Sequence, residues 1–205
     1  MENFCKICNV SRETFSKLEQ YCQSLIDWQQ KFNLVSSSSL QDVWNRHFLD
    51  SAQLFEYIPQ KALTLLDIGS GAGFPAMVLA IIGAEKTPYL KITMAESITK
   101  KTLYLNYVKD MVKVDAEIIN KRVEDIKDRK FDVITARAVT SLTDLLEYAY
   151  PILNDGGICI FPKGKKYNEE LKEAEKKWLF NVKIADSKTS DEGKILIIER
   201  IKRKK

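Results

Sequence analysis

The chain has 205 residues, of which 45% are hydrophobic and 29% charged, and its formal net charge is +4. This composition is typical of a globular protein with one sizeable core, and no run approaches the roughly 20 apolar residues of a membrane span. No basic segment followed by an apolar run opens the chain, so we predict no secretory signal. We therefore expect a cytoplasmic monomer that does not enter a membrane.

The charge is unevenly distributed along the chain. Residues 1–60 carry five basic and seven acidic side chains, and the remainder carries 27 and 21. Five of the last six residues, Arg200–Lys205, are basic. Such an end is either a solvated tail or a contact for a polyanion. The net charge alone is too small to indicate a nucleic-acid binder.

The cysteines and the single histidine limit the chemistry. Cys5 and Cys8 have the spacing of metal ligands, but a closed zinc site needs four ligands and the chain has no second pair. We therefore predict no metal site and reduced thiols. A Ser-His-Asp triad would have to use His47, and no G-x-S-x-G motif supplies its nucleophile.

The chain opens with two helical patterns. Ser11 is a suitable N-cap, and apolar residues then recur at steps of three and four from Phe15 to Phe32. Trp28 and Phe32 are predicted to lie in the core. A run of four serines, residues 36–39, breaks this helix, and a second amphipathic segment extends from Val43 to Phe55.

From Leu63 onward, short apolar runs alternate with helical patterns, which predicts a mostly parallel sheet covered on both faces. The last two runs lack a helix between them and predict an antiparallel hairpin. The predicted strands are Leu63–Ile68, Ile92–Ala95, Ala116–Ile119, Phe131–Ala136, Gly157–Phe161, Val182–Ala185 and Lys194–Ile201. The predicted helices are Phe74–Ile82, Ile98–Met111, Leu142–Tyr150 and Tyr167–Trp178. We expect a seven-stranded α/β domain over residues 61–205, with residues 1–60 as a helical extension packed on it.

A glycine-rich turn follows the first predicted strand. Gly69, Gly71 and Gly73 form a G-x-G-x-G pattern that runs straight into a helix, where a ligand can approach the backbone. Dinucleotide-binding loops instead read G-x-G-x-x-G. An acid in the preceding strand, Asp67, suits a cationic ligand better than a phosphate. The pattern is that of S-adenosylmethionine-dependent methyltransferases, and Glu96, at the end of the second strand, is placed to accept the ribose hydroxyls.

Five motifs in order make the resemblance specific. The chain resembles the RsmG (GidB) family, the methyltransferases that make 7-methylguanosine in 16S ribosomal RNA, over nearly its whole length. The motifs are Trp28 with Asn33-Leu34, Arg46-His47-x-Leu49-Asp50-Ser51, Asp67-x-Gly69-Ser70-Gly71-Ala72-Gly73-Phe74-Pro75, Thr135-Ala136-Arg137-Ala138-Val139 and Lys163-Gly164. The resemblance implies a Rossmann-like class I methyltransferase fold, S-adenosylmethionine as cofactor, and 16S ribosomal RNA or the small ribosomal subunit as partner.

The resemblance also implies roles for particular residues. Cofactor contacts are expected from Gly69, Gly71, Gly73, Phe74, Glu96, Val123, Glu124 and Arg137. The sequence departs from the usual pattern at Ala76, Glu96 and the Phe161-Pro162 pair. Pro162 removes an N–H at a strand end.

Residues for catalysis and RNA contact are less sharply defined. Arg46, His47 and Asp50 are candidate catalytic residues. Alternatively, Arg46 and His47 dock the helical segment on the sheet, with Asp50 as their ion-pair partner one turn on. Phosphate contacts are expected from Arg46, Lys100, Lys101, Lys163, Lys165, Lys166 and Arg203.

The expected reaction is methyl transfer to N7 of a guanine. N7 has an available lone pair, so no general base is required, and the enzyme aligns the reacting atoms and excludes water. A carboxylate such as Asp50 or Glu124 would assist electrostatically. The alternatives are a methyltransferase for another RNA, a protein or a small molecule, a non-catalytic ribosome-binding module, and a dinucleotide oxidoreductase, which the glycine spacing disfavours.

Overall fold

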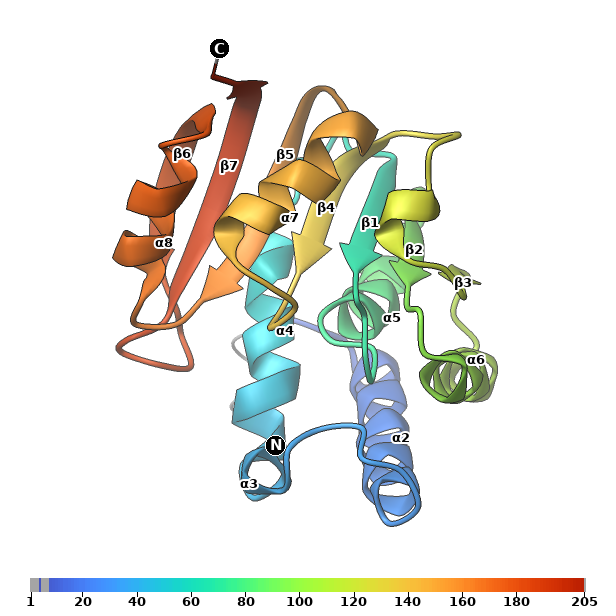
Figure 1. Ribbon diagram of the computed structural model, residues 1–205. Helices are drawn as coiled ribbons and strands as arrows, with labels where there is room; N and C mark the ends of the chain where they lie inside the picture. Colours follow the sequence, from blue (N-terminus) through green and yellow to red (C-terminus); the bar gives the residue numbers. More distant parts are fainter. Residues whose placement is uncertain (1–3, 5–7, 205) are drawn as a thin grey trace.

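The computed structural model describes residue 4 and residues 8–204. Its centre is one seven-stranded sheet in the order β3-β2-β1-β4-β5-β7-β6, in which only β7 runs antiparallel to its neighbours (Figure 1). The strands are β1 Thr64–Ile68, β2 Lys91–Ala95, β3 Ala116–Ile119, β4 Phe131–Ala136, β5 Leu153–Lys163, β6 Trp178–Asp186 and β7 Lys194–Arg203. The predicted α/β class with a mostly parallel sheet is confirmed.

Helices cover both faces of the sheet. The N-terminal helical segment, which we call the helical opening because it opens the chain, comprises α2 Arg12–Gln29, α3 Ser37–Leu40, a π-helical turn Trp44–Leu49, α4 Asp50–Ala52 and a 3-10 turn Gln53–Tyr57. The helices between strands are α5 Ala76–Lys86, α6 Thr99–Val112, α7 Leu142–Ala149 and α8 Tyr167–Ala174, with 3-10 turns at Val123–Asp125 and Tyr150–Ile152. None of the described helices is both long and apolar enough to cross a bilayer.

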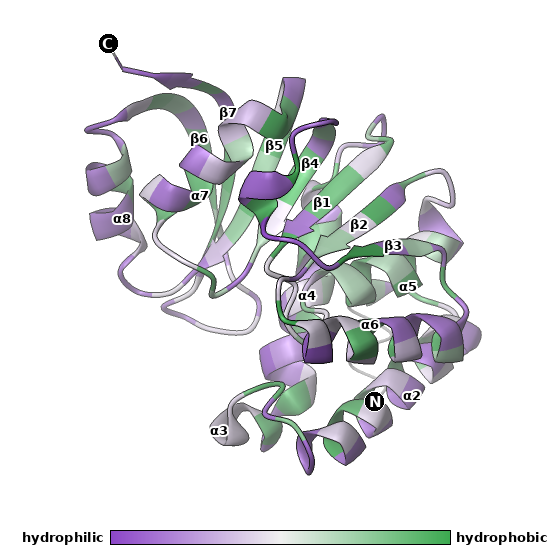
Figure 2. Ribbon diagram, turned by 45° about the vertical axis from the view of Figure 1, so that its right-hand side comes forward, coloured by the Kyte–Doolittle hydropathy of each residue, from purple (hydrophilic) through white to green (hydrophobic). Residues whose placement is uncertain are grey.

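Two apolar cores lie on opposite faces of the sheet. Because side chains alternate along a strand, Leu65 of β1 points into a core shared with α2, α5 and α6, while Leu66 points into the core under α7 and α8. Figure 2 shows the apolar residues concentrated in β1, β2, β4 and β5. The first core joins the helical opening to the sheet, since it contains both Leu18 and Leu65.

Several element boundaries differ from the prediction, most of all around α8, β6 and β5. The helix predicted over Tyr167–Trp178 ends at Ala174, and β6 begins at Trp178 rather than at Val182. The helix was predicted too long because Lys176 and Lys177 continue the helical pattern. The start of β6 was missed because β6 is an edge strand with exposed outward positions, so its sequence has no continuous apolar run. Strand β5 begins earlier than predicted, at Leu153, because Gly156 adopts a φ of +76° where the register with β4 shifts.

The basic end is not a free solvated tail, because residues up to Arg203 belong to strand β7. Strand β7 lies between β5 and β6, and Ile201 is buried. The Arg203 guanidinium lies 5.0 Å from the Trp178 ring centroid and pairs with Glu147. Because β7 is antiparallel, Arg203 lies at the sheet edge opposite to Lys194. Lys205 lies outside the described residues.

Helix α2 of the helical opening packs against the glycine-rich turn. Tyr21 of α2 donates its hydroxyl to the Ala72 carbonyl at 2.5 Å, and its ring stacks on Phe74 with centroids 5.2 Å apart. Gly73 has a φ of +103°, and a Cβ there would lie 2.6 Å from the Tyr21 hydroxyl oxygen. Gly73 therefore permits both the turn and its contact with α2.

We predict that Gly73→Ala destabilises the protein by about 3 kcal/mol, combining the left-handed backbone penalty with overpacking against Tyr21. Gly156→Ala is the matched control, because Gly156 also has a positive φ but has nothing within 4 Å of the added Cβ. It should cost only about 1 kcal/mol. Urea denaturation of both variants measures the difference, and equal losses would contradict the proposed contact.

Candidate functional site

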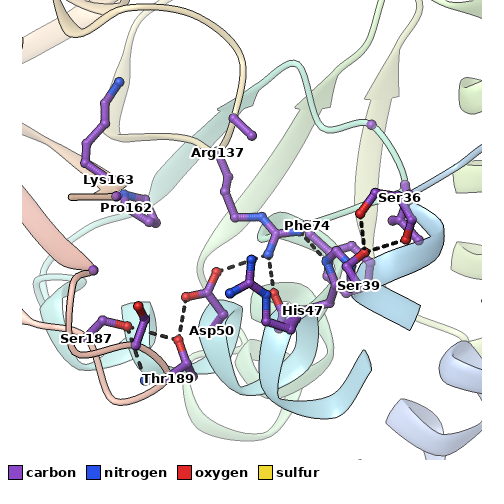
Figure 3. Close-up of a pocket in the computed structure, with 18 of the residues that line it drawn as sticks. Ser36, Ser39, His47, Asp50, Phe74, Arg137, Pro162, Lys163, Ser187 and Thr189 are labelled. Atoms are coloured by element: carbon purple, nitrogen blue, oxygen red, sulfur yellow. Dashed lines mark hydrogen bonds and ion pairs between the residues drawn. The ribbon is translucent and has the colours of Figure 1, made fainter. Parts of the chain in front are cut away.

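A cavity of about 670 Å³ opens at the carboxyl ends of β1 and β4. This is the edge at which ligands bind in open α/β sheets. Its walls come mainly from the helical opening, the residues at the ends of β1, β4 and β5, and the β6–β7 loop (Figure 3). Lys101 of α6, Glu170 of α8 and the start of β7 complete them. Of the predicted site residues, it brings together Arg46, His47, Asp50, Gly69, Gly71, Phe74, Lys101, Arg137 and Lys163.

The glycine-rich turn presents backbone to this cavity. Gly69 and Gly71 adopt φ angles of +65° and +58°. A Cβ on Gly71 would meet only the Gly69 carbonyl oxygen, at 3.8 Å, so the space beside Gly71 is open to a ligand. Gly73 is not among the lining residues, because it faces Tyr21, Met77 and Leu105. Its predicted cofactor contact stays a prediction, and its packing role is structural.

Asp67 lies beneath the turn and is fully buried. Its Oδ1 accepts a hydrogen bond from Thr135 Oγ1 at 2.7 Å, whereas its Oδ2 has no partner among the described residues. Burial raises the pKa of the Asp67 carboxyl to about 6, although bonds from Ser70 and Thr135 and the charge of Arg137 oppose that rise. A buried carboxylate oxygen without a donor favours a cationic or hydrogen-bond-donating partner. Asp67 itself is not among the residues that line the cavity.

Glu96 joins the end of β2 to the glycine-rich turn. Its Oε2 accepts from the Gly71 N–H at 2.9 Å and its Oε1 from the Ile98 N–H at 2.8 Å, and the residue is buried. Val123 is buried and Glu124 is exposed. These three predicted cofactor residues do not line the cavity, and their roles remain predictions.

Arg137 connects the sheet to the helical opening. Its Nη1 donates to the Arg46 carbonyl at 2.9 Å and to Asp50 Oδ2 at 3.0 Å, and its Nη2 lies 2.7 Å from His47 Nδ1. Its guanidinium carbon lies 5.1 Å from the Phe74 ring centroid. The guanidinium is thus held by contacts on two edges and one face, as Figure 3 shows.

His47 lies on the π-helical turn, a widened turn that often occurs at functional sites. Burial, together with the charges of Arg137 and Arg46, lowers the pKa of the His47 imidazole to about 4. Because Arg137 can only donate, the neutral ring accepts at Nδ1 and carries its hydrogen on Nε2, 2.8 Å from Ser39 Oγ. Both ring nitrogens are therefore engaged.

The hydroxyl-rich β6–β7 loop completes the cavity. Thr189 donates to Asp50 Oδ1 at 2.9 Å, and the Lys188 N–H donates to Gln53 Oε1 at 2.8 Å. Ser39, at the other end of the network, bonds back to the Ser36 carbonyl. Sequence reasoning missed these contacts, because the serine run was interpreted only as a helix break and the loop only as a hairpin connection.

The predicted phosphate-binding residues fall into two groups. Arg46, Lys101 and Lys163 line the cavity. The Lys163 ammonium already donates to Glu170 Oε2 at 2.7 Å and to the Thr140 carbonyl at 3.1 Å. The structure does not place the others in its walls; these are Lys100, Lys165, Lys166 and Arg203.

The structure holds no candidate metal site among its described residues, where no group of three or more His, Cys, Asp or Glu side chains could hold an ion. Cys5, half of the C-x-x-C motif, lies outside the described residues.

Comparison with known proteins identifies close relatives. A family model described as rRNA small subunit methyltransferase G (GidB) matches residues 14–197. A ribosomal RNA small subunit methyltransferase G from Paramagnetospirillum magneticum is 39% identical over 95% of this chain and 92% of its own. The protein of the same name from Gluconobacter oxydans is 40% identical over 95% of this chain and 97% of its own.

Solved structures share the fold at much lower identity. A ribosomal protein L11 methylase from Lactobacillus delbrueckii subsp. bulgaricus has a TM-score of 0.60 at 20% identity, covering 74% of this chain and 76% of that one. M. jannaschii TYW2 in complex with AdoMet has a TM-score of 0.57 at 14% identity, covering 83% and 78%. These likenesses confirm the predicted methyltransferase fold.

We predict that His47 makes the stability of the protein fall as the pH drops from about 6.5 toward 4. In this window the unfolded chain protonates the imidazole and the folded protein does not. Asp67 acts oppositely, because its raised pKa lets the folded protein bind a proton below about 6. The difference between wild type and His47→Gln removes the Asp67 contribution.

The advantage of wild type over His47→Gln should shrink by up to about 1.4 kcal/mol per pH unit across that window. Urea denaturation at several pH values measures it. A difference that does not vary with pH would show that His47 titrates alike in both states.

Proposed function

Because the chain belongs to the rRNA small subunit methyltransferase G family, we propose that it transfers a methyl group from S-adenosylmethionine to N7 of a guanine in small-subunit ribosomal RNA. The observation that carries this proposal is family membership over residues 14–197, combined with a cavity at the glycine-rich turn. Methylation of small-subunit ribosomal RNA is the family's activity. The choice of N7 rests on the resemblance to the RsmG (GidB) family, and the chemistry of the site is compatible with it.

The residues at the turn fit S-adenosylmethionine. The Oδ2 of Asp67 lacks a donor, and the space beside Gly71 is open. An ammonium group is a suitable partner for such a carboxylate. Gly69, Gly71 and Phe74 would hold the cofactor, with Glu96 supporting the turn from below through the Gly71 N–H. When bound, S-adenosylmethionine supplies an electrophilic methyl group attached to a sulfonium.

The arrangement of His47 supports an acceptor atom that needs no general base. His47 is the only histidine in the chain, and both its nitrogens are engaged by Arg137 and Ser39. Its lowered pKa also makes it a weak base. Guanine N7 attacks with a lone pair that it already has, and no proton leaves. The chain's task is then to orient the base and exclude water.

Of the two candidate carboxylates, Asp50 is better placed to assist. It lines the cavity, whereas Glu124 is exposed outside it. Asp50 is bonded to Arg137 and Thr189, so its position is fixed. We assign Asp50 the electrostatic role of compensating Arg137 beside a purine that becomes cationic. Arg46, which is exposed at the cavity, would contact an RNA phosphate.

We predict that Asp67→Asn weakens S-adenosylmethionine binding about tenfold or more, because the amide has no charge to attract a cation. Isothermal titration calorimetry measures the dissociation constant. Asp132→Asn is the matched control, since Asp132 is an aspartate near the start of β4, at the sheet edge opposite to the glycine-rich turn, and accepts from the Leu63 and Thr64 N–H groups. Equal affinities in the Asp67 variant and wild type would contradict the assigned contact.

The proposed function predicts that small ribosomal subunits from cells lacking the protein are methylated by the purified enzyme, with 7-methylguanosine as the product. Mass spectrometry of the digested RNA detects the product. Cells lacking the protein should lose this nucleoside from their small-subunit RNA. Transfer of the methyl group to another guanine atom would overturn the N7 assignment alone, and no transfer at all would overturn the function.

A further inference from the structure

A partly exposed row of rings lies on the outer side of α2 and α6, which run side by side in Figures 1 and 2. The ring centroids of Phe32 and Trp28 are 5.6 Å apart, and those of Trp28 and Tyr107 are 5.3 Å apart. Trp28 also packs on Tyr104, which is buried, so the row is anchored to the core. Tyr107 at the end of the row is 47% exposed, and Leu103, one helical turn before it on α6, is 60% exposed.

Cations accompany this row. The Lys100 ammonium lies 5.8 Å from the Phe32 ring centroid, and the next residue, Lys101, lines the cavity. Neither lysine forms an ion pair within the part of the chain that the structure describes. The neighbouring carboxylates, Asp27 and Asp110, bond to Gln23 and Lys109 instead. We call Trp28, Phe32, Lys100, Leu103 and Tyr107 the aromatic face.

The aromatic face continues into the cavity wall. Leu34 and Val35, which follow Phe32, line the cavity from one side, and Lys101 of α6 lines it next to Lys100. A chain leaving the cavity at this point would therefore pass over Lys100 and onto the exposed rings. The aromatic face therefore adjoins the cavity wall at Leu34, Val35 and Lys101.

We propose that the aromatic face binds unpaired nucleotides of the RNA on one side of the methylated nucleotide. Tyr107 and Leu103 offer a flat apolar surface for a base, and Lys100 and Lys101 lie where they would meet the phosphates. Stacking on exposed rings beside lysines is how proteins hold single-stranded RNA. Lysine is depleted in protein–protein interfaces, so the unpaired lysines favour RNA over a protein partner. This inference rests on the proposed function, because it takes RNA as the substrate.

Tyr107→Leu tests the proposal, because it removes the ring and keeps an apolar side chain. We expect the dissociation constant for deproteinised small-subunit RNA to rise about tenfold, as the loss of one stacked base would produce. Tyr107→Phe keeps the ring and should bind as wild type. The affinity for S-adenosylmethionine should be unchanged in both variants, since Tyr107 does not line the cavity.

Tyr89→Leu is the matched control, because Tyr89 is exposed to the same degree, at 46%, but lies on the α5–β2 connection. Lys100→Gln is an independent variant that keeps every ring. It should lower the salt dependence of RNA binding by about one phosphate contact.

The proposal is overturned if Tyr107→Leu binds the RNA as wild type does, or if Tyr107→Phe or Tyr89→Leu loses as much affinity. It is also overturned if Tyr107→Leu weakens binding to intact subunits but not to deproteinised RNA, which would identify a ribosomal protein as the occupant. A wild-type dimer that Tyr107→Leu dissociates would identify a second copy instead. Failure of wild type to methylate any RNA would count against the proposed function, whereas unchanged variant affinities with an active wild type count against this inference alone.

Discussion

The site depends on the way the Arg137 guanidinium is held. Arg137 follows β4, yet its hydrogen bonds go to the Arg46 carbonyl, His47 and Asp50, all of the helical opening. Asp50 in turn accepts from Thr189 of the β6–β7 loop. One side chain therefore fixes three segments that are distant in sequence around one cavity. Because both charges are largely buried, with 16% and 19% of their side chains exposed, removing either partner would leave the other uncompensated.

The same charge pair makes the cavity suitable for a cationic ligand. A lone guanidinium beside the glycine-rich turn would repel a sulfonium, whereas a guanidinium paired with Asp50 adds little net charge. The Oδ2 of Asp67, in contrast, has no hydrogen-bond donor among the described residues. His47 contributes no charge, because burial and two neighbouring arginines keep it neutral.

The sequence predicted the position of the glycine-rich turn and Glu96 better than it predicted the Arg137 network, for a physical reason. Gly69, Gly71 and Glu96 follow apolar strands at fixed positions, so local spacing alone places them at one sheet edge. The strands Ala116–Ile119 and Phe131–Ala136 were predicted residue for residue. The second of them lies inside the sheet and is almost wholly buried, as expected of a central parallel strand. The edge strand β6 has no continuous apolar run, and its start was misplaced.

The substrate half arises from contacts between distant segments that no local pattern encodes. Ser39 and Thr189 belong to segments interpreted as a helix break and a hairpin connection, yet they terminate the two ends of the Arg137 network. Gly73 illustrates the same limit within the motif itself. The G-x-G-x-G pattern suggests three equivalent ligand contacts, but Tyr21 occupies the space beside the third glycine. A motif therefore specifies a backbone conformation, and the neighbouring chain decides whether a ligand or a side chain uses it.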